Sequence, residues 1–174
     1  TFAGSAAGTG GNAGGTTNAR FNGPLGIVED ASGNLFVTDG NNGSVRKITS
    51  AGVVSTLATG FTTPEGIAID ASGILYVSDY GTGVIKKITS TGAVSTFVTG
   101  LTGPAGLCFD NSGNLMVADQ DANQIKKITP AGVISVYAGS GTAGFANNAN
   151  VLTARFNSPL DVQVDAAGNV FVAD

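Results

Sequence analysis

The groups in this chain that could do chemistry are mainly carboxylates, because its 174 residues include no histidine and one cysteine. Without an imidazole, the chain lacks the base of a serine hydrolase triad and the commonest metal ligand. Glu29, Glu65 and Asp161 depart from an otherwise repeated pattern. Carboxylates brought together can bind a cation, whereas separate ones are ordinary hydrated side chains. Whether these carboxylates bind a cation or are simply hydrated depends on the secondary-structure elements that position them.

Two further motifs offer weaker chemistry. Asp119, Asp121 and Asn123 have the spacing that opens a calcium loop, but the following glycine and the distal glutamate are absent. The glycine-rich run at 8–15 lacks Gly-Lys-Ser/Thr and precedes no predicted helix, so it is not a phosphate loop. We expect no metal site and no cofactor, with a divalent cation such as calcium as the alternative. Cys108 lies among apolar residues and is expected to be a core thiol.

Charge and hydropathy exclude two classes of partner. Eight basic and twelve acidic residues give a net charge of −4, so no basic field is available for nucleic acid. No apolar run reaches the roughly 18 residues of a membrane span, and we expect no membrane insertion. One cysteine allows no internal disulfide.

The strongest signal is an internal repeat. Residues 21–60 and 61–100 match at 22 of 40 positions without a gap. Residues 101–140 form a third copy, and residues 156–174 form the first half of a fourth. Residues 1–39 align with 136–174, so residues 1–3 are interpreted as the last strand of a preceding copy. The segments 4–20 and 139–155 are predicted to be long loops.

Each copy contains four short strands. In the second copy they are GIAID (66–70), LYVSD (75–79), VIKKIT (84–89) and AVSTFV (93–98), which are β-branched or aromatic and separated by turn residues. Asp30 and Gly33 predict an Asx-type turn with a positive φ at the glycine. Four strands in about 40 residues indicate a β-propeller blade. We expect an all-β propeller of four-stranded antiparallel blades, with three complete blades and partial blades at both ends.

The motifs Pro-x-Gly-[Ile/Leu], Asp-x-Ser-Gly-Asn, Val-x-Asp and [Lys/Arg]-Lys-Ile recur along the whole chain and resemble NHL repeats. The resemblance implies a propeller that usually has six blades and, in bacteria, is often extracellular. Three and a half blades depart from that number. The chain is therefore a fragment, an engineered piece, or a homo-oligomer whose copies complete each other's open blades.

The propeller geometry places the candidate residues. Innermost strands line a central channel, so Glu65 and Asp161 are expected at its mouth. The connections between the second and third strands, DGNNGS, DYGTGV and DQDANQ, differ among copies and lie on the same face as the long loops. Rigid scaffolds often present function on such loops. The predicted binding residues are Asn41, Asn42, Glu65, Tyr80, Gln120, Asp121 and Asp161.

Other repeated polar residues are interpreted as structural. Asp39, Asp79, Asp119 and Asp174 each end a second strand and are expected to make hydrogen bonds within the blade. The basic pairs at 46–47, 86–87 and 126–127 are expected on a solvated outer strand.

We therefore expect a non-catalytic binding scaffold for a protein or glycan, located outside the cell or at its surface. One alternative is a self-assembling propeller. Another is a lactonase-like hydrolase, for which the resemblance implies a cation held in the channel by carboxylate and amide ligands, here Asp161 and Glu65 together with Asn residues. The related lyases require histidine, which this chain lacks.

Overall fold

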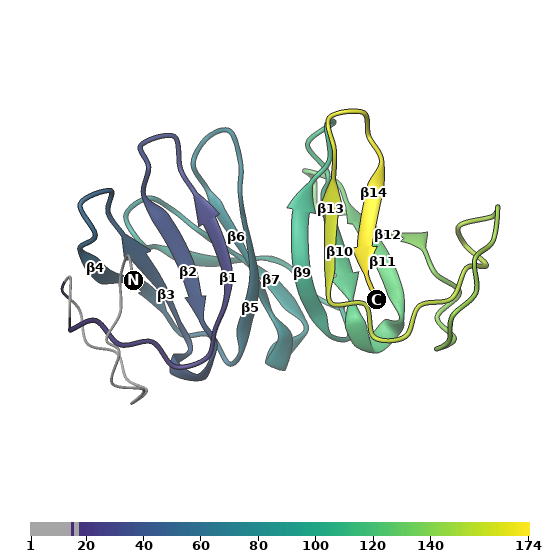
Figure 1. Cartoon of the computed structure of the whole chain (residues 1–174), viewed down its shortest axis with the longest axis horizontal. Helices are drawn as coiled ribbons and strands as arrows, with labels where there is room; N and C mark the ends of the chain where they lie inside the picture. Colours follow the sequence, from purple (N-terminus) through teal and green to yellow (C-terminus); the bar gives the residue numbers. More distant parts are fainter. Residues whose placement is uncertain (1–14, 16–17) are drawn as a thin grey trace.

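The computed structural model describes residue 15 and residues 18–174, in which the strands form three complete antiparallel sheets and one two-stranded sheet (Figure 1). Blade one contains β1 (Pro24–Glu29), β2 (Leu35–Asp39), β3 (Ser44–Ile48) and β4 (Val54–Thr59). Blade two contains β5 (Pro64–Ile69), β6 (Leu75–Asp79), β7 (Val84–Ile88) and β8 (Val94–Val98). Blade three contains β9 (Pro104–Phe109), β10 (Leu115–Asp119), β11 (Gln124–Ile128) and β12 (Ile134–Ala138), and blade four contains β13 (Asp161–Val164) and β14 (Val170–Ala173).

The predicted all-β propeller fold is confirmed. Within each complete blade the strands pair in sequence order. One-turn 3-10 helices connect the second and third strands: η1 (Gly40–Asn42), η2 (Tyr80–Thr82) and η3 (Gln120–Ala122). The part of the chain that the structure describes contains no α-helix, and hence no helix long and apolar enough to cross a membrane. The predicted strand at 1–3 and most of the predicted loop at 4–20 lie outside the described residues.

The innermost strands β1, β5, β9 and β13 are neighbours in space: β1 packs against β5, β5 against β9, and β9 against β13. Glycines make this approach possible. A Cβ built on Gly26 would lie 2.6 Å from the Glu65 carbonyl oxygen, and one on Gly66 would collide with the Ala105 carbonyl oxygen. The backbones of adjacent blades are thus in direct contact at this position.

A hydroxyl group also joins adjacent blades. Thr38 Oγ1 accepts a hydrogen bond from Gly26 N (2.7 Å) in its own blade and donates one to the Glu65 carbonyl (2.5 Å) of the next. Ser78 Oγ repeats both bonds with Gly66 N and the Ala105 carbonyl. Blade three has alanine at the equivalent position, and there Gly106 N donates directly to the Leu160 carbonyl (2.8 Å).

The apolar core lies between blades. One cluster joins blades one and two through residues such as Val45, Ile67 and Val77, and another joins blades two and three through Ile85, Leu107 and others. A third cluster joins blades three and four and includes Cys108. Burial is the main cause that raises the pKa of the Cys108 thiol to about 11, in agreement with the predicted core thiol.

The Asx turns form as predicted. Asp30 Oδ1 accepts hydrogen bonds from the backbone N–H groups of Ser32 and Asn34, both at 2.9 Å, and Gly33 has a φ of 76°. The hydrogen bond from the Asn34 side chain is the main cause that holds the pKa of the Asp30 carboxyl below its usual value.

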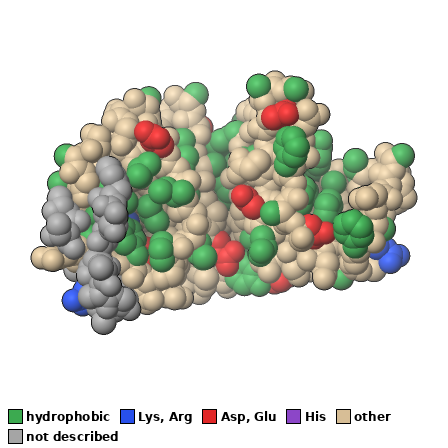
Figure 2. Space-filling model, viewed as in Figure 1, with side chains coloured by type: hydrophobic (Ala, Val, Ile, Leu, Met, Phe, Trp, Pro, Cys, Tyr) green, Lys and Arg blue, Asp and Glu red, His purple; other side chains and the backbone are tan. Residues whose placement is uncertain are grey.

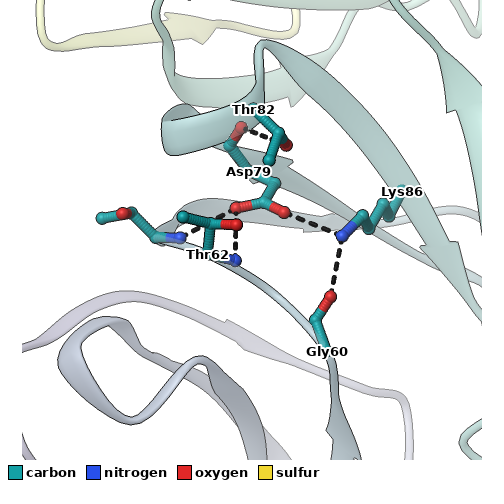
Figure 3. Close-up of polar contacts among 6 residues, drawn as sticks. Gly60, Thr62, Asp79, Thr82 and Lys86 are labelled. Carbon is teal, nitrogen blue, oxygen red and sulfur yellow. Dashed lines mark hydrogen bonds and ion pairs between the residues drawn. The ribbon is translucent and has the colours of Figure 1, made fainter.

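The expectation that the basic pairs lie on a solvated outer strand is wrong for the position of the strand and for Arg46, whereas the lysines of the pairs are partly exposed. The third strand is flanked by the second and fourth, and its first basic residue turns inward. The Arg46 side chain is fully buried, with Nη1 3.2 Å from Asp39 Oδ2 and 2.8 Å from the Arg20 carbonyl oxygen. In blade two, Lys86 Nζ lies 2.8 Å from Asp79 Oδ2 and 2.8 Å from the Gly60 carbonyl oxygen (Figure 3).

The aspartates that end the second strands have the structural role predicted for them. Asp79 Oδ1 accepts hydrogen bonds from Thr62 N (2.9 Å) and Thr63 N (2.8 Å), which fixes the linker from blade one (Figure 3). Asp39, Asp119 and Asp174 accept equivalent backbone hydrogen bonds. Each aspartate therefore ties its own blade to the chain that enters it.

The Asp79 carboxylate is expected to make folding sensitive to acid. Burial alone would raise its pKa, but Lys86 and the two backbone donors outweigh burial and lower it. The stabilisation is therefore present above the unfolded-state pKa of about 3.9 and lost as pH falls through the lower folded-state pKa. Asp79→Asn should cost about 2 kcal/mol at pH 7 and progressively less toward pH 2.

This prediction is measured as the free energy of urea unfolding of both proteins across that pH range. Glu29→Gln, which alters an exposed carboxylate, provides the control and should track the wild type. A stability difference for Asp79→Asn that stays constant down to pH 2 would contradict the role of the ionised carboxylate.

Candidate functional site

A cavity of about 690 Å³ opens where the four innermost strands meet the second-to-third-strand connections. We call it the channel cavity. Every blade contributes to it, so no single repeat contains the site. Its lining consists of Leu25, Gly26, Ile27, Glu65, Gly66, Ile67, Tyr80, Gly106, Leu107, Gln120, Leu160, Asp161 and Gln163.

One side of the channel cavity is acidic. Tyr80 projects from η2 and donates its hydroxyl to the Asp121 carboxylate of η3, with O–O distances of 3.0 and 3.2 Å. Glu65 at the start of β5 is half-buried, and this burial, followed by the nearby charge of Asp121, raises its pKa. The hydrogen bond to Asp121 is the main cause that raises the pKa of Tyr80. These groups bias the site against anions.

The rest of the cavity combines apolar side chains with one more carboxylate. Leu25 and Ile27 on β1 and Leu160, just before β13, expose 60%, 60% and 58% of their surface. Asp161 is exposed on β13, and its Oδ1 accepts a hydrogen bond from Val162 N. On the face that carries β1 and β13, Figure 2 shows acidic side chains among apolar ones, with the visible basic side chains toward the two ends.

The structure brings together four of the seven predicted binding residues. Glu65, Tyr80, Gln120 and Asp161 all line the channel cavity, and Asp121 contacts it through Tyr80. The sequence analysis missed Gln163, although its signal was readable. Gln163 is a polar residue at a position where the other repeats have Val28, Ala68 and Cys108.

Asn41 and Asn42 do not line the cavity. The Asn41 side chain donates to Asn22 Oδ1 (3.3 Å), and the Asn42 side chain donates to Asp39 Oδ2 (2.8 Å). Both hydrogen bonds hold η1 against its own blade. The structure therefore places these two residues apart from the other predicted residues.

The spacing that suggested a calcium loop produces three separate contacts. Asp119 Oδ1 accepts hydrogen bonds from Thr102 N and Gly103 N, whereas Asp121 pairs with Tyr80. Asn123 Oδ1 accepts a hydrogen bond from Ser158 N at 3.0 Å. Within residue 15 and residues 18–174, no group of three or more Cys, Asp or Glu side chains is arranged to hold a metal ion.

No protein-family model matches this chain, and no curated protein matches it. Solved structures do. An auxiliary nutrient binding protein from Bacteroides thetaiotaomicron matches 91% of this chain and 46% of its own, with a TM-score of 0.74 and 17% identity. Virginiamycin B lyase from Staphylococcus aureus matches 87% of this chain and 48% of its own, with a TM-score of 0.66 and 18% identity. A putative gluconolactonase matches 99% of this chain and 59% of its own, with a TM-score of 0.70 and 18% identity.

These similarities establish the β-propeller fold. The chain spans about half the length of the structures it matches. The neighbours include two proteins named as enzymes and one named as a binding protein, so the shared fold specifies no single activity.

Proposed function

We propose that this chain is part of an NHL-type propeller that acts as a binding scaffold outside the cell or at its surface. The observation that carries the proposal is the channel cavity, where Glu65, Tyr80, Gln120 and Asp161 converge from three blades. All four residues stand where the repeats differ: Tyr80 and Gln120 lie in the variable connections, Glu65 is equivalent to apolar residues of the other repeats, and Asp161 is equivalent to a glycine in them. The NHL assignment is supported by the recurring motifs, of which the aspartates that end the second strands tie each blade to its linker.

The chemistry of the cavity suits a protein or glycan ligand. The exposed side chains of Leu25, Ile27 and Leu160 can cover the apolar face of a sugar ring or an apolar side chain. Carboxylates beside them accept hydrogen bonds from hydroxyl or amine donors, and such charged hydrogen bonds are stronger than neutral ones. We place the ligand at this mouth, with Tyr80 and Asp121 as one wall.

Substitutions in the cavity test the proposal. A glycan panel and a peptide panel are screened against the wild type, and the affinity of the best ligand is measured for Glu65→Gln and Asp161→Asn. Each change removes a charged acceptor and should weaken binding about 10-fold while the fold is retained. Glu29→Gln makes the same chemical change outside the cavity and should bind like the wild type. Unchanged affinity in both cavity variants would contradict the proposal.

The same proteins address the lactonase-like alternative, which is favoured by the presence of Glu65 and Asp161 in one cavity. The assay is hydrolysis of a sugar lactone with and without Ca²⁺. Lactone turnover that requires the cation and is lost in Asp161→Asn would replace the binding-scaffold proposal with this one.

A further inference from the structure

A second cavity, of about 400 Å³, lies between blades two and three at the opposite end of the strands from the channel mouth. We call it the inter-blade groove. Its rim comes from three turns, which contribute Asp70 and its neighbours, Gly113, and Thr129 with Pro130. Its volume falls in the range of about 300–1,000 Å³ that is typical of small-molecule sites.

The floor of the groove is aromatic. The Tyr76 ring packs edge-to-face against Phe97 of its own blade, with centroids 5.2 Å apart, and against Phe109 of the next blade at 5.1 Å. Leu115 and Ile128 complete the apolar lining. The equivalent positions between blades one and two hold Phe36, Leu57 and Ile69 in place of Tyr76, Phe97 and Phe109. The aromatic floor is therefore a departure from the repeat and not a consequence of the fold.

Two polar groups of residues that line the groove, one on its floor and one at its rim, have an atom with no hydrogen-bond partner among the described residues. Tyr76 exposes 9% of its surface, and its hydroxyl makes no hydrogen bond to any residue that the structure describes but keeps access to solvent. A hydroxyl that reaches solvent can donate and accept a hydrogen bond there. Because Tyr76 lines the groove, a bound molecule can supply that partner.

The second group is the outer oxygen of Asp70. Asp70 Oδ1 accepts hydrogen bonds from Ser72 N (2.8 Å) and Ile74 N (3.0 Å), as in the other Asx turns. In the equivalent turn of blade one, the second oxygen of Asp30 accepts the Asn34 side-chain amide at 2.8 Å. Ile74 stands in place of that asparagine, so Asp70 Oδ2 has no such donor among the described residues.

We infer that the inter-blade groove binds a small aromatic molecule of one or two rings that carries a hydroxyl or amino donor. The ring system packs against the floor made by Tyr76, Phe97 and Phe109. The donor binds Asp70 Oδ2, and the Tyr76 hydroxyl bonds to the same polar group. This site is separate from the channel cavity and does not depend on the proposed function of that cavity.

The experiment uses 2-naphthol as the probe and naphthalene as the matched compound without a donor. Titrations are followed by the amide signals of the isotope-labelled protein. We expect saturable binding of 2-naphthol with shifts at Ala71, Ser72 and Gly113, and binding of naphthalene at least 5-fold weaker because it lacks the hydrogen-bond donor.

Three variants separate the parts of the site, and each introduces a residue that blade one carries at the equivalent position, so folding should be retained. Tyr76→Phe removes the hydroxyl, Phe97→Leu removes an aromatic contact, and Ile74→Asn returns a donor to Asp70. Each should weaken 2-naphthol binding about 3- to 10-fold. Leu57→Phe at the equivalent position of blade one and Glu65→Gln in the channel cavity should leave it unchanged.

The inference is overturned by any of three results. One is no saturable binding of 2-naphthol up to its solubility limit. Another is amide shifts confined to residues away from the groove. The last is unchanged affinity for 2-naphthol in Tyr76→Phe and Ile74→Asn, which would show that neither polar group takes part.

Discussion

Replacing Arg46 with methionine is expected to lower the free energy of unfolding by about 3–5 kcal/mol, because the change leaves a buried carboxylate without its cation. The side chains of Arg46 and Asp39 are both fully buried, with Nη1 3.2 Å from Oδ2. The same guanidinium donates to the Arg20 carbonyl and lies 5.2 Å from the centre of the Phe21 ring. The substitution therefore removes an ion pair, a linker contact and a cation–π contact together.

Blade three offers a matched control for this prediction. Lys126 Nζ lies 4.0 Å from Asp119 Oδ2, and its side chain is 16% exposed, although Asp119 itself is buried, so this pair is longer and less enclosed than the Arg46 pair. Lys126→Met should cost clearly less than Arg46→Met, about 1–2 kcal/mol. Urea unfolding followed by circular dichroism measures both variants. Equal losses at the two sites would show that burial of the Arg46 pair does not determine its contribution.

The turns and strands were predictable because their causes are local. Asp30 and Gly33 set the Asx turn through hydrogen bonds within five residues, and the same residue types recur in the other blades. The alternation of β-branched residues and turns then defines four strands in each repeat. No contact between distant residues is needed for this part of the fold, so one sequence with internal copies was sufficient.

The burial of Arg46 could not be predicted in the same way. A basic residue on a strand is usually solvated, and the sequence shows no local partner. The partners are Asp39 on the neighbouring strand and the carbonyl of Arg20, 26 residues earlier in the chain. One usable signal was present: each complete repeat places an aspartate seven positions before its basic residue, as in Asp39–Arg46 and Asp79–Lys86.

The candidate site residues were predictable only where a residue differs in type from the residues at the equivalent positions of the other repeats. Glu65 and Asp161 were found because they stand at or beside a repeated glycine, and both line the channel cavity. Sequence variation within the 3-10 turns was a poorer guide to the site, because it does not reveal the direction of a side chain. The Asn42 side chain, for example, donates a hydrogen bond to Asp39 of its own blade. The inter-blade groove was missed because Ile74 lies in a turn that otherwise varies little.

The second large effect is expected at the glycines of the innermost strands, where Gly66→Ala should destabilise the protein by about 3 kcal/mol. A Cβ on Gly66 would collide with the Ala105 carbonyl oxygen and lie 3.0 Å from Gly106 Cα and 3.1 Å from Leu107 N. All three are backbone atoms, so relief requires blades two and three to separate. Separation would open the apolar cluster that these blades share, which includes Leu107.

Gly73→Ala separates this steric effect from backbone strain. Gly73 has a φ of 81°, and a Cβ there would meet no atom within 4 Å, so its replacement costs only the left-handed conformation, about 1 kcal/mol. Gly66 is not in that region, so its cost comes from the blade contact alone. A loss for Gly66→Ala no larger than that for Gly73→Ala would refute the close approach of the blades.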